Sequence, residues 1–156
     1  FIVKWPGVTP PGSTNDTPVI STDFYPTLLE MSGQPSAPGT PVDGISLVPL
    51  LRGTGGIDRD ALYWHYPHYS NQGGFPGAAI REGNFKLLER FEDGRVHLYN
   101  LRNDLGERHD LASKMPERVD SMRRKLHAWY AEVDAKFLQP KDAGPQPWRP
   151  STSTLP

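Results

Sequence analysis

The chain has 156 residues, enough for one domain, or for the end of one domain followed by a small second one. Its formal net charge is −1 without a long run of one sign, which argues against a nucleic-acid partner. Cysteine is absent, which excludes disulfides, thiolate metal ligands and cysteine nucleophiles within these residues. No apolar stretch approaches the roughly 20 residues that a membrane-spanning helix needs, so we expect no membrane partner.

The N-terminal residues 1–3 form an apolar run that is typical of a buried strand. No turn, cap or initiator methionine precedes them, so we interpret the chain as a truncated one. An orphan strand of this kind exposes unpaired backbone groups and apolar side chains, which promotes association. We therefore expect self-association through the N-terminal segment, or folding of that segment back onto the small domain.

A short strand and two short helices are predicted next. Residues 17–20 favour the strand. Residues 21–23 supply N-cap side chains for the first helix, which stops at Gly33. After a link rich in proline and glycine, Ser46 suits the N-cap of one or two helical turns that end at Gly53.

From residue 61 onward the hydrophobic period changes to that of strands. The separators at residues 82–84 and 92–94 are short and turn-like, so the β-prone runs predict an antiparallel meander. These runs are residues 62–66, 78–81, 85–91 and 96–99.

A long amphipathic helix is predicted to begin at Pro116. Its apolar stripe, at steps of three and four, consists of Val119, Met122, Leu126, Trp129, Val133 and Phe137. The meander needs cover on one face and the stripe needs an apolar surface, so we expect the helix to lie across the sheet. The proline-rich residues 139–156 should wrap over a neighbouring surface or be disordered.

Several phrases, taken in order, resemble the C-terminal third of the formylglycine-dependent sulfatases, which belong to the alkaline-phosphatase-like superfamily. None is specific alone, but five in the right order with plausible spacing are hard to reach by chance. The phrases are FIVKWPG (1–7), DFYPTLLEMSG (23–33), DGISLVPLL (43–51), AIREGNFKLL (79–88) and LYNLRNDLGERHDLA (98–112).

The resemblance implies an α+β chain with three parts. Residues 1–53 would be the end of the large α/β domain, a strand plus helices. Residues 54–138 would be a small subdomain, a four-stranded antiparallel sheet packed against a C-terminal amphipathic helix, and residues 139–156 a proline-rich tail. The resemblance also suggests a periplasmic or secreted protein, because members of the family are often found there, although the residues of this chain do not indicate a location.

The family's chemistry uses a formylglycine made from Cys or Ser in a Cys/Ser-x-Pro-x-Arg motif, together with a calcium ion. That motif is absent, because residues 113–118 (SKMPER) place the proline one position too late. Calcium and formylglycine are therefore implied only for a full-length parent. We assign no catalytic residue and no metal ligand to this chain and expect it to be inactive alone.

The segment YWHYPHY (63–69), followed by a glycine-rich loop, is the densest cluster of candidate site residues. Aromatic rings stack on sugars and imidazoles hydrogen-bond hydroxyl or sulfate groups, so we single out His65, His68 and Tyr66 as substrate-binding candidates. Strand alternation places His65 and His68 on opposite faces unless the strand ends or bulges near Tyr66. The structural alternative is that the aromatic residues are core and the histidines are hydrogen-bonded there.

Other polar residues receive simpler interpretations. Arg81 and Lys86 flank a hairpin and can reach an anionic sugar, although charges at turns are usually solvated. The remaining histidines, His97, His109 and His127, are interpreted as surface or capping residues. The scattered acidic residues lack the alternating pattern of a calcium loop and are interpreted as turn formers: Asp58, Asp60, Glu92, Asp93 and Asp104.

The resemblance implies that the chain is the C-terminal part of a sulfatase that supplies substrate-cleft walls, and the aromatic and histidine cluster favours a sulfated carbohydrate as the substrate. Two alternatives remain open: a related phosphoester or phosphonate hydrolase, and a non-catalytic carbohydrate-binding or scaffolding module. An autonomous module predicts measurable sugar affinity from the isolated chain, whereas part of a sulfatase cleft predicts little or none.

Overall fold

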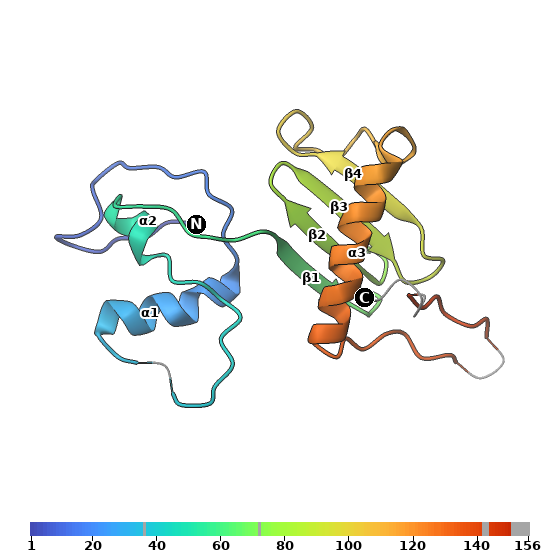
Figure 1. Cartoon of the computed structure of the whole chain (residues 1–156), viewed down its shortest axis with the longest axis horizontal. Helices are drawn as coiled ribbons and strands as arrows, with labels where there is room; N and C mark the ends of the chain where they lie inside the picture. Colours follow the sequence, from blue (N-terminus) through green and yellow to red (C-terminus); the bar gives the residue numbers. More distant parts are fainter. Residues whose placement is uncertain (36, 72, 142–143, 151–156) are drawn as a thin grey trace. The chain divides into compact units, whose positions relative to one another are not determined.

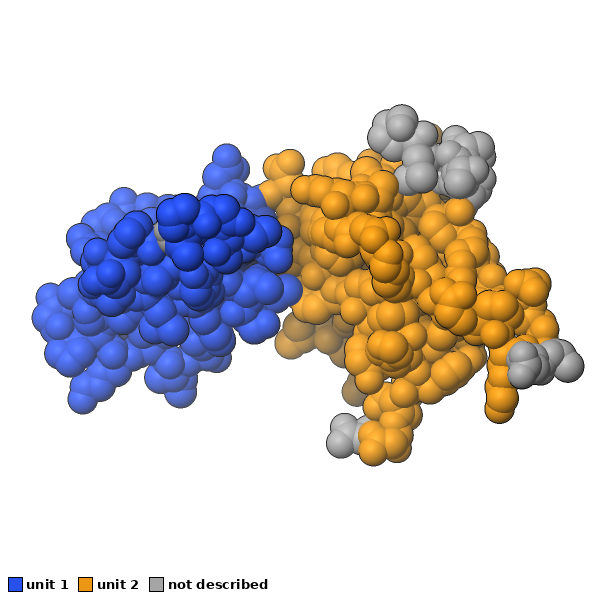
Figure 2. All heavy atoms as spheres, turned by 90° about the horizontal axis from the view of Figure 1, so that it is seen from below, with its two compact units in different colours: residues 1–59 blue, residues 60–156 orange. Residues whose placement is uncertain are grey.

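The computed structural model describes residues 1–35, 37–71, 73–141 and 144–150. The chain divides into two compact units, Phe1–Arg59 and Asp60–Pro156, which Figure 2 shows in blue and orange. Within the described ranges, no helix combines the length and apolar character needed to cross a membrane.

The described residues of the first unit form one short 3-10 turn and two helices. The turn η1 (Ser21–Asp23) leads into α1 (Phe24–Ser32), and α2 (Val48–Arg52) follows after a long irregular link. Both helices end before a glycine, as the sequence predicted. The N-cap of α2 is Leu47 and not Ser46, although the Ser46 hydroxyl accepts a hydrogen bond from the Val48 N–H at 3.3 Å.

The two strands predicted at the start of the chain are wrong. Residues 1–3 and 17–20 are irregular in the structure. A strand requires a neighbour that pairs with its backbone groups, and the described residues provide none beside these segments. The Phe1 ring instead stacks on Phe24 of α1 with ring centroids 4.7 Å apart, while Ile2 is 97% exposed.

The buried carboxylate of Asp23 holds the first unit together. It accepts hydrogen bonds from the N–H groups of Ile20 (2.9 Å) and Ile45 (3.0 Å) and from the guanidinium of Arg59 (3.0 Å). Burial acts to raise the pKa of Asp23, but the bonds from Arg59, Ile45 and Ile20 outweigh it and hold this pKa below its usual value. One side chain thus joins η1, the link before α2 and the end of the unit.

The second unit is built on a four-stranded antiparallel sheet. Strand order is the same in space as in sequence, so the predicted meander is confirmed. The strands are β1 (Leu62–Tyr66), β2 (Gly77–Glu82), β3 (Phe85–Arg90) and β4 (Val96–Asn100).

Helix α3 (Pro116–Glu132), preceded by the short turn η2 (Ala112–Lys114), lies across one face of this sheet (Figure 1). The core between them consists of Ala78, Ile80, Leu87, Phe91, Leu98, Val119, Met122, Leu126 and Tyr130. The predicted stripe is wrong at its end, because the helix stops at Glu132 and Val133 is 45% exposed. Phe137 still packs on the core, from the irregular segment that follows.

His127 is not the surface residue that the sequence suggested. Only 4% of it is exposed, on the sheet-facing side of α3, where it contacts the fully buried Glu89 of β3. In contrast, His109 is solvent-exposed and His97 hydrogen-bonds Asp110 at 2.9 Å. The helix period places residue 127 beside Leu126 and Tyr130, so its burial follows from the orientation of α3.

Candidate functional site

The end of β1 carries the candidate site, and strand alternation divides its side chains as expected. Tyr63 and His65 lie on the face that α3 covers, where the Tyr63 ring stacks on Trp129 at 5.0 Å between centroids. Trp64 and Tyr66 lie on the opposite face and are 39% and 54% exposed. The two faces therefore present different chemistry to their surroundings.

His65 is enclosed by aromatic rings. Its ring centroid lies 5.1 Å from that of Phe91, 5.8 Å from Tyr130 and 5.5 Å from Phe137. Burial, together with the nearby His68, lowers the pKa of His65, so its neutral form is favoured. Its Nε2 atom is buried and has no hydrogen-bond partner among the described residues. This environment is that of a packing residue between β1 and α3.

Tyr66 and His68 form an exposed pair. Their ring centroids are 5.5 Å apart and their planes are nearly perpendicular at 80°. Strand β1 ends at Tyr66, and Pro67 follows outside the ladder, so the chain turns and brings His68 beside Tyr66. An aromatic face next to an imidazole is a suitable surface for a polar ring such as a sugar.

The loop after His68 is attached to the end of β3 by a polar clamp. The Tyr69 hydroxyl donates to Glu92 Oε1 at 3.1 Å, and Glu92 also forms an ion pair with Arg90. The Arg90 guanidinium carbon lies 4.5 Å from the centroid of the Phe75 ring. The hydrogen bond from Arg90 lowers the pKa of Glu92, and that from Tyr69 adds to the effect.

Sequence reasoning interpreted Glu92 only as a turn former and missed this clamp. The partners Tyr69 and Glu92 are 23 residues apart, so no local pattern could link them. Gly77 at the loop's end is also required, because a Cβ atom there would lie 2.7 Å from the backbone oxygen of Glu89. The loop can therefore meet β2 only through a glycine.

Arg81 lies far from the Tyr66–His68 pair. In the ladder Tyr66 pairs with Gly77 and Leu62 pairs with Arg81, so four residues separate the two positions along β2. At the usual rise per residue of a strand this is about 14 Å. Arg81 Nε donates to the Gly83 backbone oxygen at 3.2 Å, and Lys86 is paired with Glu107 at 2.6 Å. The structure does not bring these cations together with the histidines.

The residues present do not fit a calcium ion. In the described part of the chain, no three His, Cys, Asp or Glu side chains gather as metal ligands. The more enclosed carboxylates are already committed to other partners, Asp23 to Arg59 and Glu89 to Arg123. No step of a mechanism can therefore be assigned to a metal in this chain.

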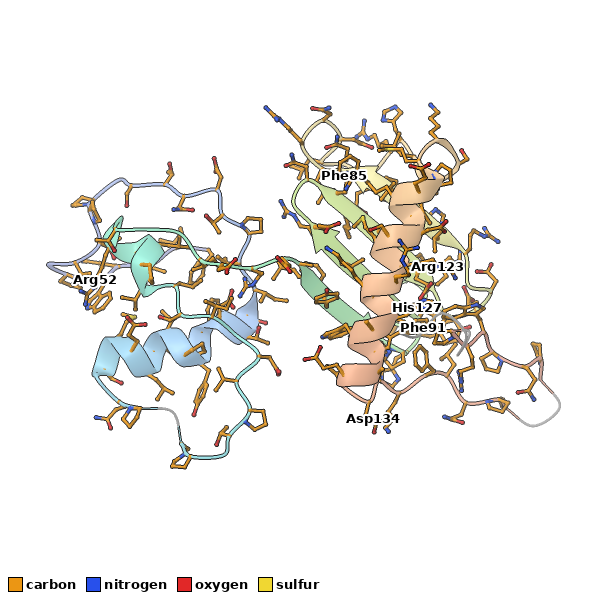
Figure 3. All side chains as sticks on the ribbon, in the orientation of Figure 1. Arg52, Phe85, Phe91, Arg123, His127 and Asp134 are labelled. Atoms are coloured by element: carbon orange, nitrogen blue, oxygen red, sulfur yellow. The ribbon has the colours of Figure 1, made fainter. Side chains whose placement is uncertain are left out.

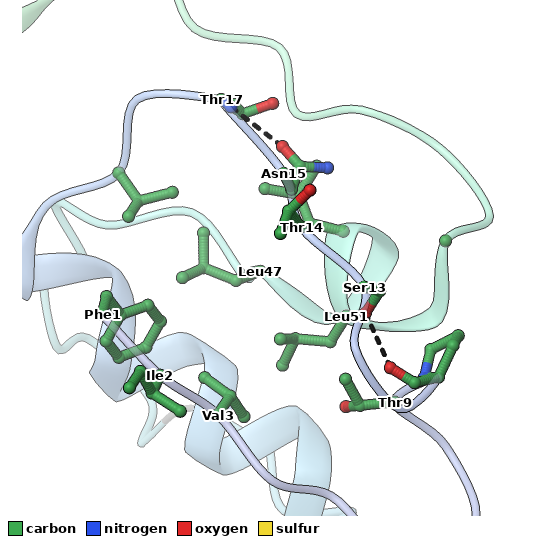
Figure 4. Close-up of a pocket in the computed structure, with 14 residues that line it drawn as sticks. Phe1, Ile2, Val3, Thr9, Ser13, Thr14, Asn15, Thr17, Leu47 and Leu51 are labelled. Carbon is green, nitrogen blue, oxygen red and sulfur yellow. Dashed lines mark hydrogen bonds between the residues drawn. The ribbon is translucent and has the colours of Figure 1, made fainter.

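A cavity of about 540 Å³ lies within the first unit (Figure 4). Apolar side chains of residues 1–3 and of Leu47 and Leu51 line one part, and the polar loop 9–17 lines the other. None of its lining side chains is titratable, so it offers no acid or base. It is a recess with one apolar and one polar side and not a candidate catalytic centre.

Comparison with known proteins identifies the class of this fold. The chain aligns with the solved structure of BT1596, a 2-O GAG sulfatase, with a TM-score of 0.62 and 25% identity over 72% of this chain and 25% of that one. It also aligns with a phosphonate monoester hydrolase of Agrobacterium radiobacter, with a TM-score of 0.54 and 25% identity over 82% of this chain and 28% of that one. The architecture is that of a sulfatase C-terminal region.

The family follows from the sequence match. The model described as N-sulphoglucosamine sulphohydrolase, C-terminal, matches residues 1–136, and the chain belongs to this sulfatase family. A sulfatase of Formosa agariphila is 37% identical over 150 residues, which cover 86% of this chain and 27% of the relative. Human arylsulfatase A is 32% identical, over 84% of this chain and 30% of the relative. The chain thus spans less than a third of these relatives' length.

Proposed function

We propose that this chain is the C-terminal region of a sulfuric ester hydrolase that acts on a sulfated carbohydrate, and that it supplies one wall of the substrate cleft. The family match over residues 1–136 carries the enzyme class. The name of BT1596 as a GAG sulfatase supports a carbohydrate substrate. The nucleophile and calcium site that the family implies would be contributed by other parts of the full-length enzyme.

Within that wall, His68 and Tyr66 are the proposed substrate contacts. Both side chains are exposed and adjacent, and the clamp through Glu92 and Arg90 attaches their loop to the sheet. His65 has a supporting role, because it is packed against Phe91 and its neighbours beneath α3. Arg81 can contribute only to a more distant anionic group of an extended substrate.

The test is substitution in a full-length sulfatase that carries this sequence. His68→Ala should reduce kcat/KM for a sulfated oligosaccharide by about tenfold, the loss of roughly 1.4 kcal/mol of transition-state binding. A small aryl sulfate, which does not reach the wall, should be hydrolysed at an unchanged rate. His109→Ala is the matched control, because its exposed imidazole lies beyond β4. Equal effects of both variants on the oligosaccharide would reject the assignment of His68.

The phosphonate hydrolase alternative has one supporting observation, the alignment with the enzyme of Agrobacterium radiobacter. Assaying the full-length protein with matched aryl sulfate and aryl phosphonate esters separates the two. A preference for phosphonate would overturn the sulfatase proposal.

The binding-module alternative is tested with the chain itself. Titration calorimetry with a sulfated disaccharide should give little or no heat, because most of a sulfatase cleft lies outside these residues. A clear millimolar or tighter affinity that is lost on Tyr66→Ala would favour an autonomous carbohydrate-binding role.

A further inference from the structure

A fully buried carboxylate lies between the sheet and α3. Glu89 of β3 has no exposed surface, and three side chains of α3 bind it. Arg123 Nε donates to Oε1 at 2.7 Å, the Tyr130 hydroxyl donates to Oε2 at 3.0 Å, and His127 Nε2 lies 3.0 Å from both oxygens. A buried charge is tolerated only when partners of this kind replace its lost hydration. We call these four residues the Glu89 cluster.

The C-terminal segment covers this cluster with Trp148. The indole is stacked nearly parallel to Phe91, with an interplanar angle of 7° and 6.3 Å between centroids. It lies 5.9 Å from the His127 ring, and the Arg123 guanidinium carbon is 5.8 Å from its centroid. Figure 3 shows the labelled side chains of Phe91, Arg123 and His127 gathered where α3 crosses the sheet.

Gly94 allows the indole to approach this closely. A Cβ atom built at residue 94 would lie 2.2 Å from Trp148 Nε1 and 2.4 Å from its Cδ1. Neither distance is possible for real atoms, so any side chain at residue 94 would displace the indole. The turn between β3 and β4 is therefore shaped to receive an aromatic ring.

Arg149 provides a second attachment. Its guanidinium donates to the backbone oxygen of Leu138 and lies over the Phe137 ring, 5.5 Å from the centroid. The tail thus returns to the segment that leaves α3, and the two neighbouring residues Trp148 and Arg149 bind adjacent surfaces. An aromatic residue beside an arginine offers both apolar burial and charge-assisted bonds, a combination enriched at protein interfaces.

We propose that Phe91, Gly94, Arg123 and His127 form a docking socket whose occupant is this chain's own Trp148–Arg149 pair. The docked indole completes the enclosure of the Glu89 cluster by excluding water from its open side. Exclusion of water lowers the local dielectric constant, which strengthens the bonds from Arg123 and His127 to Glu89. Residues 144–150 then act as an integral strap of the second unit. This inference does not depend on the proposed enzymatic activity.

A pair of glycine substitutions tests the socket. Gly94 and Gly83 both lie in connections between strands and have positive φ, 71° and 56°, so alanine strains the backbone at either position. Only Gly94→Ala also displaces the indole, because a Cβ at Gly83 would meet no atom within 4 Å. Gly94→Ala should lower the midpoint of thermal unfolding by about 4–8 °C more than Gly83→Ala, the shift produced by roughly one kilocalorie per mole in a domain of this size.

The same comparison in a Trp148→Ala background decides the mechanism. The extra shift caused by Gly94→Ala should disappear there, because the indole that it displaces is already missing. Equal shifts for the two glycine variants in the original background would overturn the proposal. An extra shift that persists without Trp148 would also overturn it.

A second measurement covers the case in which Gly94→Ala does not fold. With ¹⁵N-labelled histidine, the ring N–H of His127 should exchange slowly with water in the unmodified chain and rapidly in Trp148→Ala. Trp148→Phe should retain most of the protection, because a smaller ring can still stack on Phe91. Unchanged exchange in Trp148→Ala, with an unchanged unfolding midpoint, would show that the tail does not seal the cluster.

Discussion

Replacement of Glu89 by glutamine is expected to destabilise the second unit strongly, although it changes only one atom. In the original chain both carboxylate oxygens are acceptors, Oε1 for Arg123 and Oε2 for Tyr130, and His127 bonds both. Glutamine converts one oxygen into an NH₂ group, which cannot accept. At least one of the bonds that α3 donates to Glu89 is then lost in a buried site.

The magnitude follows from what each partner loses. A hydrogen bond to a charged group contributes about 1.5–3 kcal/mol, and breaking a buried ion pair costs about 3–5 kcal/mol. The side chain of Arg123 is 32% exposed, so water replaces part of its interaction and its share must be reduced. The Tyr130 hydroxyl can also rotate to accept from the new amide. We therefore expect a loss of about 2–3 kcal/mol in the free energy of unfolding.

The assay is urea denaturation of the whole chain at pH 7, followed by circular dichroism. Glu132→Gln is the matched control, because this exposed glutamate ends the same helix and should cost less than about 0.5 kcal/mol. Tyr130→Phe should cost about 1 kcal/mol alone and much less in the Glu89→Gln background, because the shared bond is then already lost. A loss for Glu89→Gln no larger than that of the control would refute the role of the cluster.

Three further predictions concern other parts of the chain. Folding lowers the pKa of Asp23, so its stabilising contribution is present above the ordinary aspartate pKa of about 3.9 and is lost as pH falls through the folded value. Asp23→Asn should therefore destabilise the first unit at pH 7 and make its stability less dependent on pH in the acid range. The Ile45 amide signal reports both effects, because this amide donates to Asp23. Ile2, which is 97% exposed, should promote self-association, so light scattering should find a lower mean mass for Ile2→Asp than for the original chain, and equal masses would contradict this. Leu126→Ala should lower the free energy of unfolding by about 2–5 kcal/mol, because Leu126 is fully buried. Val133 follows the end of α3 and is exposed, so Val133→Ala should lower it by less than about 1 kcal/mol in the same urea titration.

The sequence alone determined the second unit's elements and the alternation at the candidate site. The four strands appear as β-prone runs, the last three joined by short turns, and α3 begins at Pro116, because these features depend on neighbouring residues. The same local rule separated His65 from Tyr66, since successive side chains of a strand point to opposite faces. The resemblance of ordered phrases to sulfatases also needed no coordinates, and the match over residues 1–136 confirmed it.

Only the tertiary structure decided which polar residues are buried. Glu89 lies between Leu87 and Phe91 on the helix-covered face, a charge within an apolar alternation that could have drawn attention, but its partners are 34 to 41 residues away. His127 looked like a surface residue because its burial depends on how α3 rotates against the sheet. The predicted strand at residues 1–3 failed for the complementary reason: its sequence favours pairing, but a strand exists only where another segment supplies the partner.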